Sequence, residues 1–302
     1  MALIFSLAGT GALELLEGMT KRAMKAGVGA VVLLGVTGVF PVSAQLPSLT
    51  DKDHLGYFVA ADRRNFQFRI DSNGKAVVNV LDGKGQPLNK DYAISVAFNV
   101  EETMPDGKTI SRKFTAESLE SEQEATTKPK DLTIKGKVTG DIEFEASITE
   151  DRGAIILGGR LLNPAGLKNP TRFSIEVDIP KAVPKPKKDE EKDEKKAAKE
   201  QKERIKGDRV QLVWTDGKKA RITSDQEVEG SSKEVTGPGI TVASIEFAVF
   251  EDRKITLTAA PNSSMRLSNK AKQSLSEGFT LSWSADPAKD PNGKARLALE
   301  VK

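Results

Sequence analysis

Two pairs of acidic residues have the type and spacing that hydrolytic chemistry requires. Glu143 and Glu145 stand two positions apart in one strand-like stretch, and Glu176 and Asp178 do the same in another. Side chains two apart on a strand share a face. Two carboxylates about 5–10 Å apart would suit a glycosidase, if the two faces converged. Alternating charge is also expected on the solvated face of any sheet, and that interpretation involves no catalysis.

The other reactive side chains are few. The chain has no cysteine, which excludes thiol nucleophiles, thiolate metal sites and disulfides. Its one histidine, His54, cannot build a multi-histidine metal site, and we expect it to lie exposed in a loop near the start of the mature chain. No glycine-rich phosphate loop occurs. Gly158-Gly159 lies inside an apolar run, which indicates a bulge or close packing.

One stretch partly matches a calcium-binding loop. Asp290, Asn292 and Gly293 have the spacing found in the middle of an EF-hand loop. Ala288 would then be the first ligand and Leu299 the last, and neither side chain carries an oxygen. The stretch therefore predicts a turn rather than a metal site.

Aromatic residues make up only 5% of the chain, so there are few candidates for a stacking platform for sugars. Trp214 and Trp283 stand in register with apolar neighbours, which predicts core packing, and Tyr57 and Tyr92 are the only tyrosines. The net charge of +3 comes from interleaved acids and bases and favours no nucleic acid. We assign no catalytic, cofactor-binding or metal-binding residue and predict a protein that is not an enzyme and needs no cofactor.

The N-terminal region resembles an export signal in its layout. Lys21, Arg22 and Lys25 make a positive region, residues 26–40 are uncharged and mostly apolar, and Val42-Ser43-Ala44 offers small residues for cleavage before Gln45. The apolar run is shorter than the roughly 20 residues that a spanning helix needs. We therefore predict a cleaved signal peptide over 1–44, no membrane span after cleavage, and a periplasmic, envelope-associated or secreted protein.

Residues 1–18 fit this layout poorly, because they precede the basic cluster and contain Glu14 and Glu17. The hypothesis that follows is that translation starts at Met19.

The mature chain reads as short strands separated by turns. Residues 66–70 alternate apolar and polar side chains, Asn73-Gly74 supplies a tight turn, and residues 76–81 return as the second strand of a hairpin. Residues 92–100 form the longest clean alternation, and the polar residues 115–131 read as a long loop. Such spacing without helical periodicity predicts antiparallel sandwiches.

Residues 181–208 are almost entirely Lys, Glu, Asp and Ala after two prolines, with no apolar stripe. They predict an exposed, partly helical spacer. A docking site for an acidic polymer is the alternative, which the mixture of charge signs disfavours. Strand patterns resume after residue 209, and the last hairpin is expected to turn at 290–293.

The two halves share short sequence anchors in the same order, which suggests a duplication. The anchors are listed here in pairs: Asp106-Gly107-Lys108 with Asp216-Gly217-Lys218, Ile142-Glu143-Phe144 with Ile245-Glu246-Phe247, Glu150-Asp151-Arg152 with Glu251-Asp252-Arg253, and the strand at Phe173 with the strand at Phe279.

The predicted architecture is all-β, with two antiparallel Ig-like β-sandwich domains, 45–180 and 209–302, joined by the charged, partly helical linker 181–208. The second domain is a proposed duplicate of the first. The function expected from this layout is an exported, non-catalytic binding or structural module of the bacterial envelope that mediates protein interactions. The alternative is a carbohydrate-active or glycan-binding protein that uses the strand carboxylates on a polysaccharide.

Overall fold

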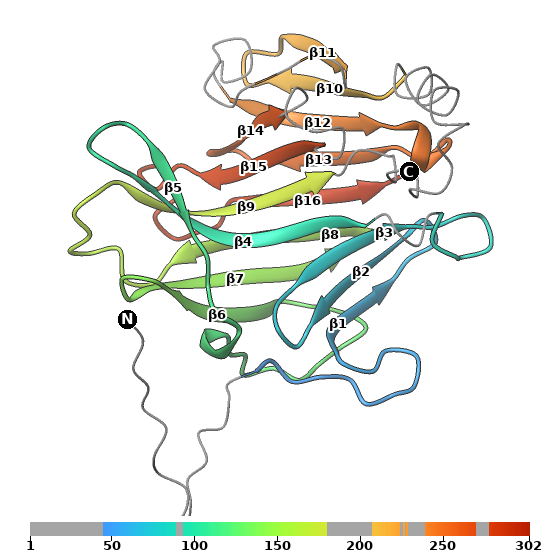
Figure 1. Ribbon diagram of the computed structural model, residues 1–302, viewed down its shortest axis with the longest axis horizontal. Helices are drawn as coiled ribbons and strands as arrows, with labels where there is room; N and C mark the ends of the chain where they lie inside the picture. The colour runs from blue at the N-terminus through green and yellow to red at the C-terminus, as the bar shows by residue number, and fades with distance from the viewer. Residues whose placement is uncertain are drawn as a thin grey trace, which may run out of the picture. The chain divides into compact units, whose positions relative to one another are not determined.

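The computed structural model describes residues 45–88, 93–179, 207–223, 226, 228, 239–269 and 278–302 (Figure 1). Strands dominate these ranges, and the helices among them are short 3₁₀ turns, such as η2 (Ala116–Ser118) and η3 (Ala248–Phe250). No helix within the described ranges has the length and apolar character to cross a membrane. The all-β prediction is confirmed. The predicted signal peptide lies outside the described residues, as does the predicted linker apart from its last two positions.

The strands of the first half are β1 (Tyr57–Asp62), β2 (Phe66–Asp71), β3 (Ala76–Val80), β4 (Ile94–Thr103), β5 (Thr109–Arg112), β6 (Leu132–Val138), β7 (Ile142–Asp151), β8 (Ala154–Leu161) and β9 (Thr171–Ile179). Those of the second half are β10 (Arg209–Trp214), β11 (Lys219–Thr223), β12 (Ile240–Glu246), β13 (Ile255–Ala259), β14 (Ser263–Asn269), β15 (Phe279–Ala285) and β16 (Arg296–Val301). The predicted first hairpin is confirmed as β2 and β3.

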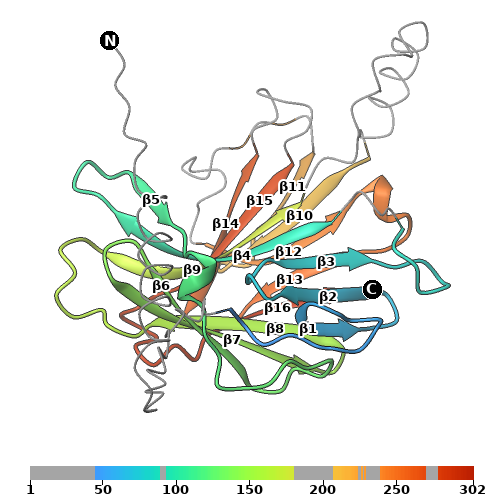
Figure 2. The same ribbon diagram turned by 60° about the horizontal axis from the view of Figure 1, so that its bottom comes forward.

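The strands form one curled antiparallel sheet rather than two separate sandwiches (Figure 2). Its order is β1-β2-β3-β4-β9-β15-β14-β12-β13-β16-β8-β7-β6, and β5, β10 and β11 attach beside this path. Strands of the two halves pair directly, β9 with β15 and β8 with β16. One sheet therefore contains strands from both predicted sandwiches, and the division into domains 45–180 and 209–302 stays a prediction.

The predicted C-terminal hairpin is also wrong. β16 does not pair with β15, which precedes it; it lies between β13 and β8. The turn itself exists, and the Asp290 carboxylate accepts hydrogen bonds from the backbone N–H groups of Lys294 and Ala295 at 2.8 and 2.7 Å. An Asp that caps a loop in this way stabilises the turn, as the sequence predicted, and leaves the next strand free to pair elsewhere.

Alternation along the strands places one continuous apolar core inside the curl. Rings from β4, β7 and β9 meet there, since the centroids of Phe98 and Phe173 lie 6.3 Å apart and those of Phe144 and Phe173 lie 5.8 Å apart. Phe247, Phe250 and Phe279 make a similar group from the second half. Aromatic pairs at such distances add to the stabilisation gained from burial alone.

Residues 114–126 close the sheet, although the sequence predicted only a polar loop over 115–131. The path ends in β1 on one side and in β6 on the other. Thr126 bridges Val59 of β1, while Glu120 bridges Lys135 of β6. The segment therefore covers the backbone of both end strands, which would otherwise be open for pairing.

The closing segment also fills the core, mainly through Leu119, which is 1% exposed. Its side chain packs so closely on neighbouring segments that a Cβ at Gly74 would lie 2.2 Å from Leu119 Cδ1 and one at Gly136 would lie 2.8 Å from Leu119 Cδ2. Gly74, in the turn between β2 and β3, and Gly136, in β6, thus make room for one leucine.

The proposed duplication is supported at one anchor only. In both Asp-Gly-Lys turns the aspartate Oδ1 accepts the lysine backbone N–H at 3.0 Å, and the glycine φ is +83° at Gly107 and +80° at Gly217. In contrast, Ile142 begins β7 whereas Ile245 lies near the end of β12. The Glu-Asp-Arg anchors also differ, because the first belongs to a tight β7–β8 turn and the second follows η3. Duplication stays a prediction.

We predict that Leu119→Ala destabilises the protein by about 2–5 kcal/mol, because it leaves a cavity where the closing segment meets the core. Denaturant unfolding measures the loss. Leu55→Ala is the matched control, since Leu55 is 69% exposed and its truncation should change the unfolding free energy by less than about 0.5 kcal/mol. Equal effects for the two variants would show that Leu119 does not hold the closure.

Candidate functional site

The two carboxylate pairs do not form one site. Glu143 and Glu145 flank Phe144 on β7, and Phe144 points into the core, where its ring meets that of Phe173 on β9. Glu176 and Asp178 have the opposite parity to Phe173 and therefore leave the other side of β9. Since the inward neighbours of the two pairs meet, the carboxylates point outward from separate walls, and the glycosidase arrangement is not built.

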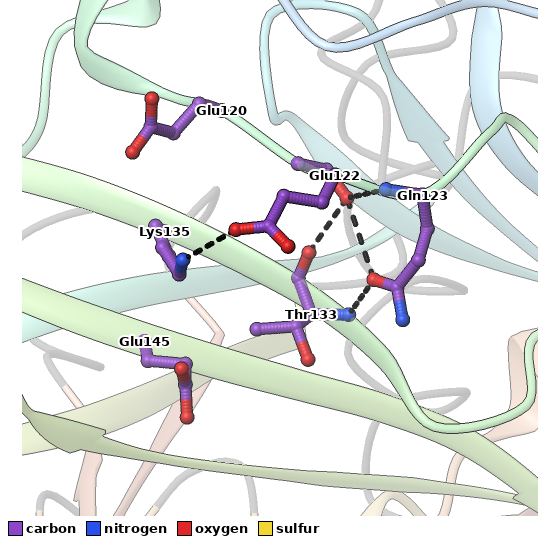
Figure 3. A pocket seen from close by; sticks show the side chains of 7 residues that line it. Glu120, Glu122, Gln123, Thr133, Lys135 and Glu145 are labelled. Carbon is purple, nitrogen blue, oxygen red and sulfur yellow. Dashed lines mark hydrogen bonds and ion pairs between the residues drawn. The ribbon is translucent and has the colours of Figure 1, made fainter.

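Glu145 instead borders a groove of about 490 Å³ on the outer surface (Figure 3). The closing segment makes one wall of this groove, and β6 and β7 make the other. We call it the acidic groove, and its lining residues are Glu120, Ser121, Glu122, Gln123, Thr133, Lys135 and Glu145.

Hydrogen bonds fix the wall of the acidic groove. Ser121 Oγ donates to the Thr133 carbonyl at 2.7 Å, and the Thr133 N–H donates to Gln123 Oε1 at 2.8 Å. Gln123 Nε2 donates in turn to the Asp131 carbonyl at 2.9 Å. These side chains replace a missing strand neighbour for β6, so they are structural as well as surface groups.

Among the described residues that line the acidic groove, Lys135 is the one cation. Its Nζ donates to Glu122 Oε1 at 2.9 Å (Figure 3). This hydrogen bond lowers the pKa of Glu122 and raises that of Lys135, so both are charged near neutral pH. Groups that stay ionised can bind hydroxyls or cations, but they do not exchange protons as a general acid or base does.

A second polar cluster joins the two halves of the chain. Glu101 on β4 is 4% exposed. Its Oε2 accepts hydrogen bonds from Arg172 Nη2 at 2.7 Å and from Arg266 Nη2 at 2.5 Å, and its Oε1 accepts one from Ser282 Oγ at 3.0 Å. Burial raises the pKa of Glu101, but the guanidinium groups of Arg172 and Arg266 outweigh burial and bring it below the ordinary value.

The neighbouring pair on β9 lies beside this cluster. Burial, together with the charges of Asp178 and Glu101, raises the pKa of Glu176. Asp178 Oδ1 accepts a hydrogen bond from Thr280 Oγ1 on β15 at 2.6 Å. A carboxyl whose pKa is raised beside another carboxylate is typical of active sites, and it is also common where charges crowd on a sheet.

His54 is less exposed than the sequence predicted. It does lie in the loop before β1, but its ring is 20% exposed and held between two carboxylates. Nδ1 lies 2.8 Å from Asp51 Oδ1, and Nε2 lies 3.1 Å from Asp62 Oδ2. These hydrogen bonds, that to Asp62 first, raise the pKa of His54. Asp62 also pairs with Arg69, so the histidine ties the lead-in of the chain to β1 and β2.

The aromatic side chains offer no sugar platform within the described ranges. Trp283 is fully buried, and its Nε1 donates to Ser263 Oγ at 3.0 Å, while Trp214 is 8% exposed. Both confirm the predicted core role. Arg69 covers the ring of Tyr57 at 5.6 Å, and Tyr92 lies outside the described residues.

Close packing is the reason for Gly158-Gly159. Both glycines pair in regular register with β7, so there is no bulge. A Cβ at Gly158 would lie 2.6 Å from Arg296 Cδ, and one at Gly159 would lie 2.4 Å from Phe173 Cε1.

Sequence reasoning missed the cluster around Glu101. Its arginines and serine come from strands far along the chain, and Arg266 stands 165 positions from Glu101. A charged residue in mid-strand, where alternation alone predicts solvent exposure, carried no signal that it would be buried.

We predict that Glu101→Gln lowers the unfolding free energy at neutral pH by about 2 kcal/mol or more, because two arginines lose their buried counter-charge. The lowered folded-state pKa means that the carboxylate's contribution is present above its ordinary value of 4.5 and is lost as the pH falls through the folded value. The variant should therefore show a smaller loss of stability in acid than the parent.

Glu143→Gln is the control for this measurement, since Glu143 forms only a partly exposed ion pair with Lys137. It should change the unfolding free energy by less than about 1 kcal/mol. Identical acid profiles for the parent and Glu101→Gln would contradict the role given to the buried carboxylate.

No protein-family model matches the chain, and no curated protein sequence matches it. Among solved structures the chain is similar to the Slr1438 protein from Synechocystis sp. PCC 6803, with a TM-score of 0.43 and 11% sequence identity over 80% of this chain and 93% of that one. Similarity at this level supports no conclusion about function. The function proposed below therefore rests on the described surface of this protein.

Proposed function

We propose that the protein is an exported, non-catalytic binding or structural module of the bacterial envelope, and that it engages a protein partner by strand addition at β5. The observation that carries this proposal is an apolar side chain on an open strand edge. Ile110 of β5 is 38% exposed, and within the described ranges β5 pairs with β4 alone. Strand addition uses main-chain hydrogen bonds for affinity and side-chain contacts for specificity.

The register identifies which backbone groups of β5 face outward. The Met104 N–H donates to the Lys108 carbonyl at 2.7 Å, which makes these two residues a hydrogen-bonded pair. Such pairs alternate along an antiparallel ladder. Ser111, opposite Glu101, is therefore in a non-hydrogen-bonded pair, and its N–H and carbonyl face away from β4.

A second short strand is the natural comparison for β5. Within the described ranges β11 pairs only with β10, and its edge carries Lys219 and Arg221. Charged residues on an edge strand disfavour unspecific pairing. β5 has Ile110 in its centre, so of the two edges it is the better partner for an apolar strand.

The two carboxylate pairs support a non-catalytic role, because they point outward from separate walls and do not face each other as the carboxylates of a glycosidase do. The alternative function is glycan binding, and the acidic groove favours it, since its carboxylates and amide could bind sugar hydroxyls. None of the described residues that line the groove is aromatic, however, and stacking on such rings is the usual source of affinity for sugars.

Export rests on the layout of residues 19–45. We predict that N-terminal sequencing of the mature protein, purified from cell fractions, starts at Gln45, and that a cleavage-blocked precursor starts at Met19. A protein recovered from the cytoplasm with residues 19–44 still attached would contradict export. A precursor starting at Met1 would refute only the start site.

In-cell crosslinking followed by mass spectrometry tests the partner. The parent protein should capture one or two envelope proteins at near-stoichiometric levels, and Ile110→Lys and Ser111→Pro should lose them. The proline removes only an N–H that faces away from β4, so the hairpin is retained. Thermal unfolding of both variants confirms that they fold.

Arg221→Pro is the matched control, because it makes the same change on the edge of β11. It should capture the same proteins as the parent. Loss of capture with Arg221→Pro and not with Ser111→Pro would assign the interaction to β11. Retention of the protein on the polysaccharide fraction without captured protein would favour the glycan alternative.

A further inference from the structure

His54 is the only histidine of the chain, and a histidine is the side chain that ordinarily changes its charge near neutral pH. Its ring lies between two carboxylates, with Nδ1 2.8 Å from Asp51 Oδ1 and Nε2 3.1 Å from Asp62 Oδ2. Asp51 belongs to the same loop as His54, whereas Asp62 is the last residue of β1. The imidazole therefore joins this loop to the sheet through both of its nitrogens.

This arrangement distinguishes the two protonation states of the ring. A charged imidazolium carries an N–H on each nitrogen, so it can donate to Asp51 and to Asp62 at the same time. A neutral imidazole has one N–H and one lone pair. In either neutral tautomer, one nitrogen presents its lone pair to a carboxylate oxygen, and one of the two hydrogen bonds is lost.

The loop depends on His54 for its attachment to the sheet. Its base is closed by backbone hydrogen bonds, from the Leu49 N–H to the Tyr57 carbonyl at 2.8 Å and from the Gly56 N–H to the Leu49 carbonyl at 3.2 Å. Between these bonds, the residues on either side of His54 are exposed: Asp51, Lys52, Asp53 and Leu55. The backbone N–H groups of Asp53 and His54 bond only Asp51, inside the loop. The ring of His54 is thus the group that holds the tip of the loop against β1.

Three charged groups act on the ring: Asp51 from the loop, Asp62 from β1 and Arg69 from β2. The hydrogen bonds to Asp62 and then Asp51 raise the pKa of His54, and they outweigh burial and the opposing charge of Arg69. Burial raises the pKa of Asp62, but its bonds to His54 and Arg69 bring it below the ordinary value. At Asp51 the bond to His54 also outweighs burial and lowers the pKa. Both carboxylates are therefore ionised in the pH range in which His54 titrates.

We propose that His54 makes the loop 49–56 a pH-sensitive latch, which the charged ring holds against β1 and the neutral ring releases. The sign follows from linkage. The folded-state pKa of His54 is raised above its ordinary value of 6.5, so its contribution is fully present below pH 6.5 and is lost as the pH rises through the folded value. The lowered pKa values of Asp51 and Asp62 keep the latch closed in weak acid. This device is independent of strand addition at β5.

NMR titration of the full mature chain tests the first half of the proposal, because a single histidine gives a single imidazole signal. The midpoint should lie above 6.5 in the parent, and Asp62→Asn should lower it, since an amide carries no charge to hold the imidazolium. Glu143→Gln is the control, because Glu143 pairs with Lys137 on another part of the sheet, and it should leave the midpoint unchanged. A parent midpoint at or below 6.5, or equal shifts in the two variants, would overturn the proposal.

A spin label on the loop tests whether titration of the ring releases it. The chain has no cysteine, so Leu55→Cys places a nitroxide at one site, beside His54 and on a side chain that is 69% exposed. The ratio of mobile to immobile label should rise about tenfold as the pH passes through the midpoint, which is the effect expected for loss of one hydrogen bond between charged groups. The same label in a His54→Gln background should be mobile below the midpoint as well as above it.

A label at Leu162→Cys is the matched control, because Leu162 is also exposed, at 37%, and lies beyond the end of β8. Its mobility should stay constant over the same pH range. A label at position 55 whose mobility does not change with pH would overturn the latch even if the histidine titrates above 6.5, because the ring would then lose its proton without releasing the loop. Equal changes at both labels would show a general loosening of the fold and would also overturn it.

Discussion

Direct strand pairing between the two halves of the chain is the constraint on which the rest of the structure depends. Six residue pairs join β9 to β15, from Phe279 with Ile179 to Ser284 with Ser174, and four join β16 to β8. Because the N–H and C=O groups of a buried strand must be satisfied, neither β8 nor β9 is complete without its partner from the second half. One core, rather than two, follows from this exchange.

The pairing also explains where charge is found inside the protein. Glu101, Arg172, Ser282 and Arg266 stand on four consecutive strands of the path, β4, β9, β15 and β14, and all face away from the core. Their hydrogen bonds cross from the first half to the second. A buried ion pair is seldom a large source of net stability, but it penalises any wrong register because a slipped strand would leave a charge without a partner.

Local features of the fold could be predicted from the sequence, and pairing partners could not. Alternation located β2, β4, β7 and β9, and turn residues located the hairpin at Gly74 and the Asp106 turn, because these signals depend only on near neighbours. Pairing depends on contacts across the whole chain. The sequence therefore gave no sign that β16 lies between β13 and β8, or that a polar stretch carrying Leu119 would close the sheet.

The candidate sites, like the fold, could be predicted only in their local features and not in their contacts across the chain. Strand parity was enough to place Glu143, Glu145, Glu176 and Asp178 on the outer sides of their strands, but it did not predict the burial that raises the pKa of Glu176. Their separation in space depends on the curl of the sheet, which has no local signal. At Gly158-Gly159 the sequence predicted a bulge or close packing, but it could not name the residues that pack there, because Arg296 comes from β16 and Phe173 from β9.

The position of β16 has a consequence for folding. Its residues, Arg296–Val301, pair with β13 on one side and on the other with β8, which stands far earlier in the chain. Contacts between residues so far apart in sequence form slowly, whereas a local hairpin such as β2–β3 can form early. The path of the sheet is complete only when β16 has joined β13 to β8, and loss of this one strand would divide the path at an inner position rather than shorten it at one end.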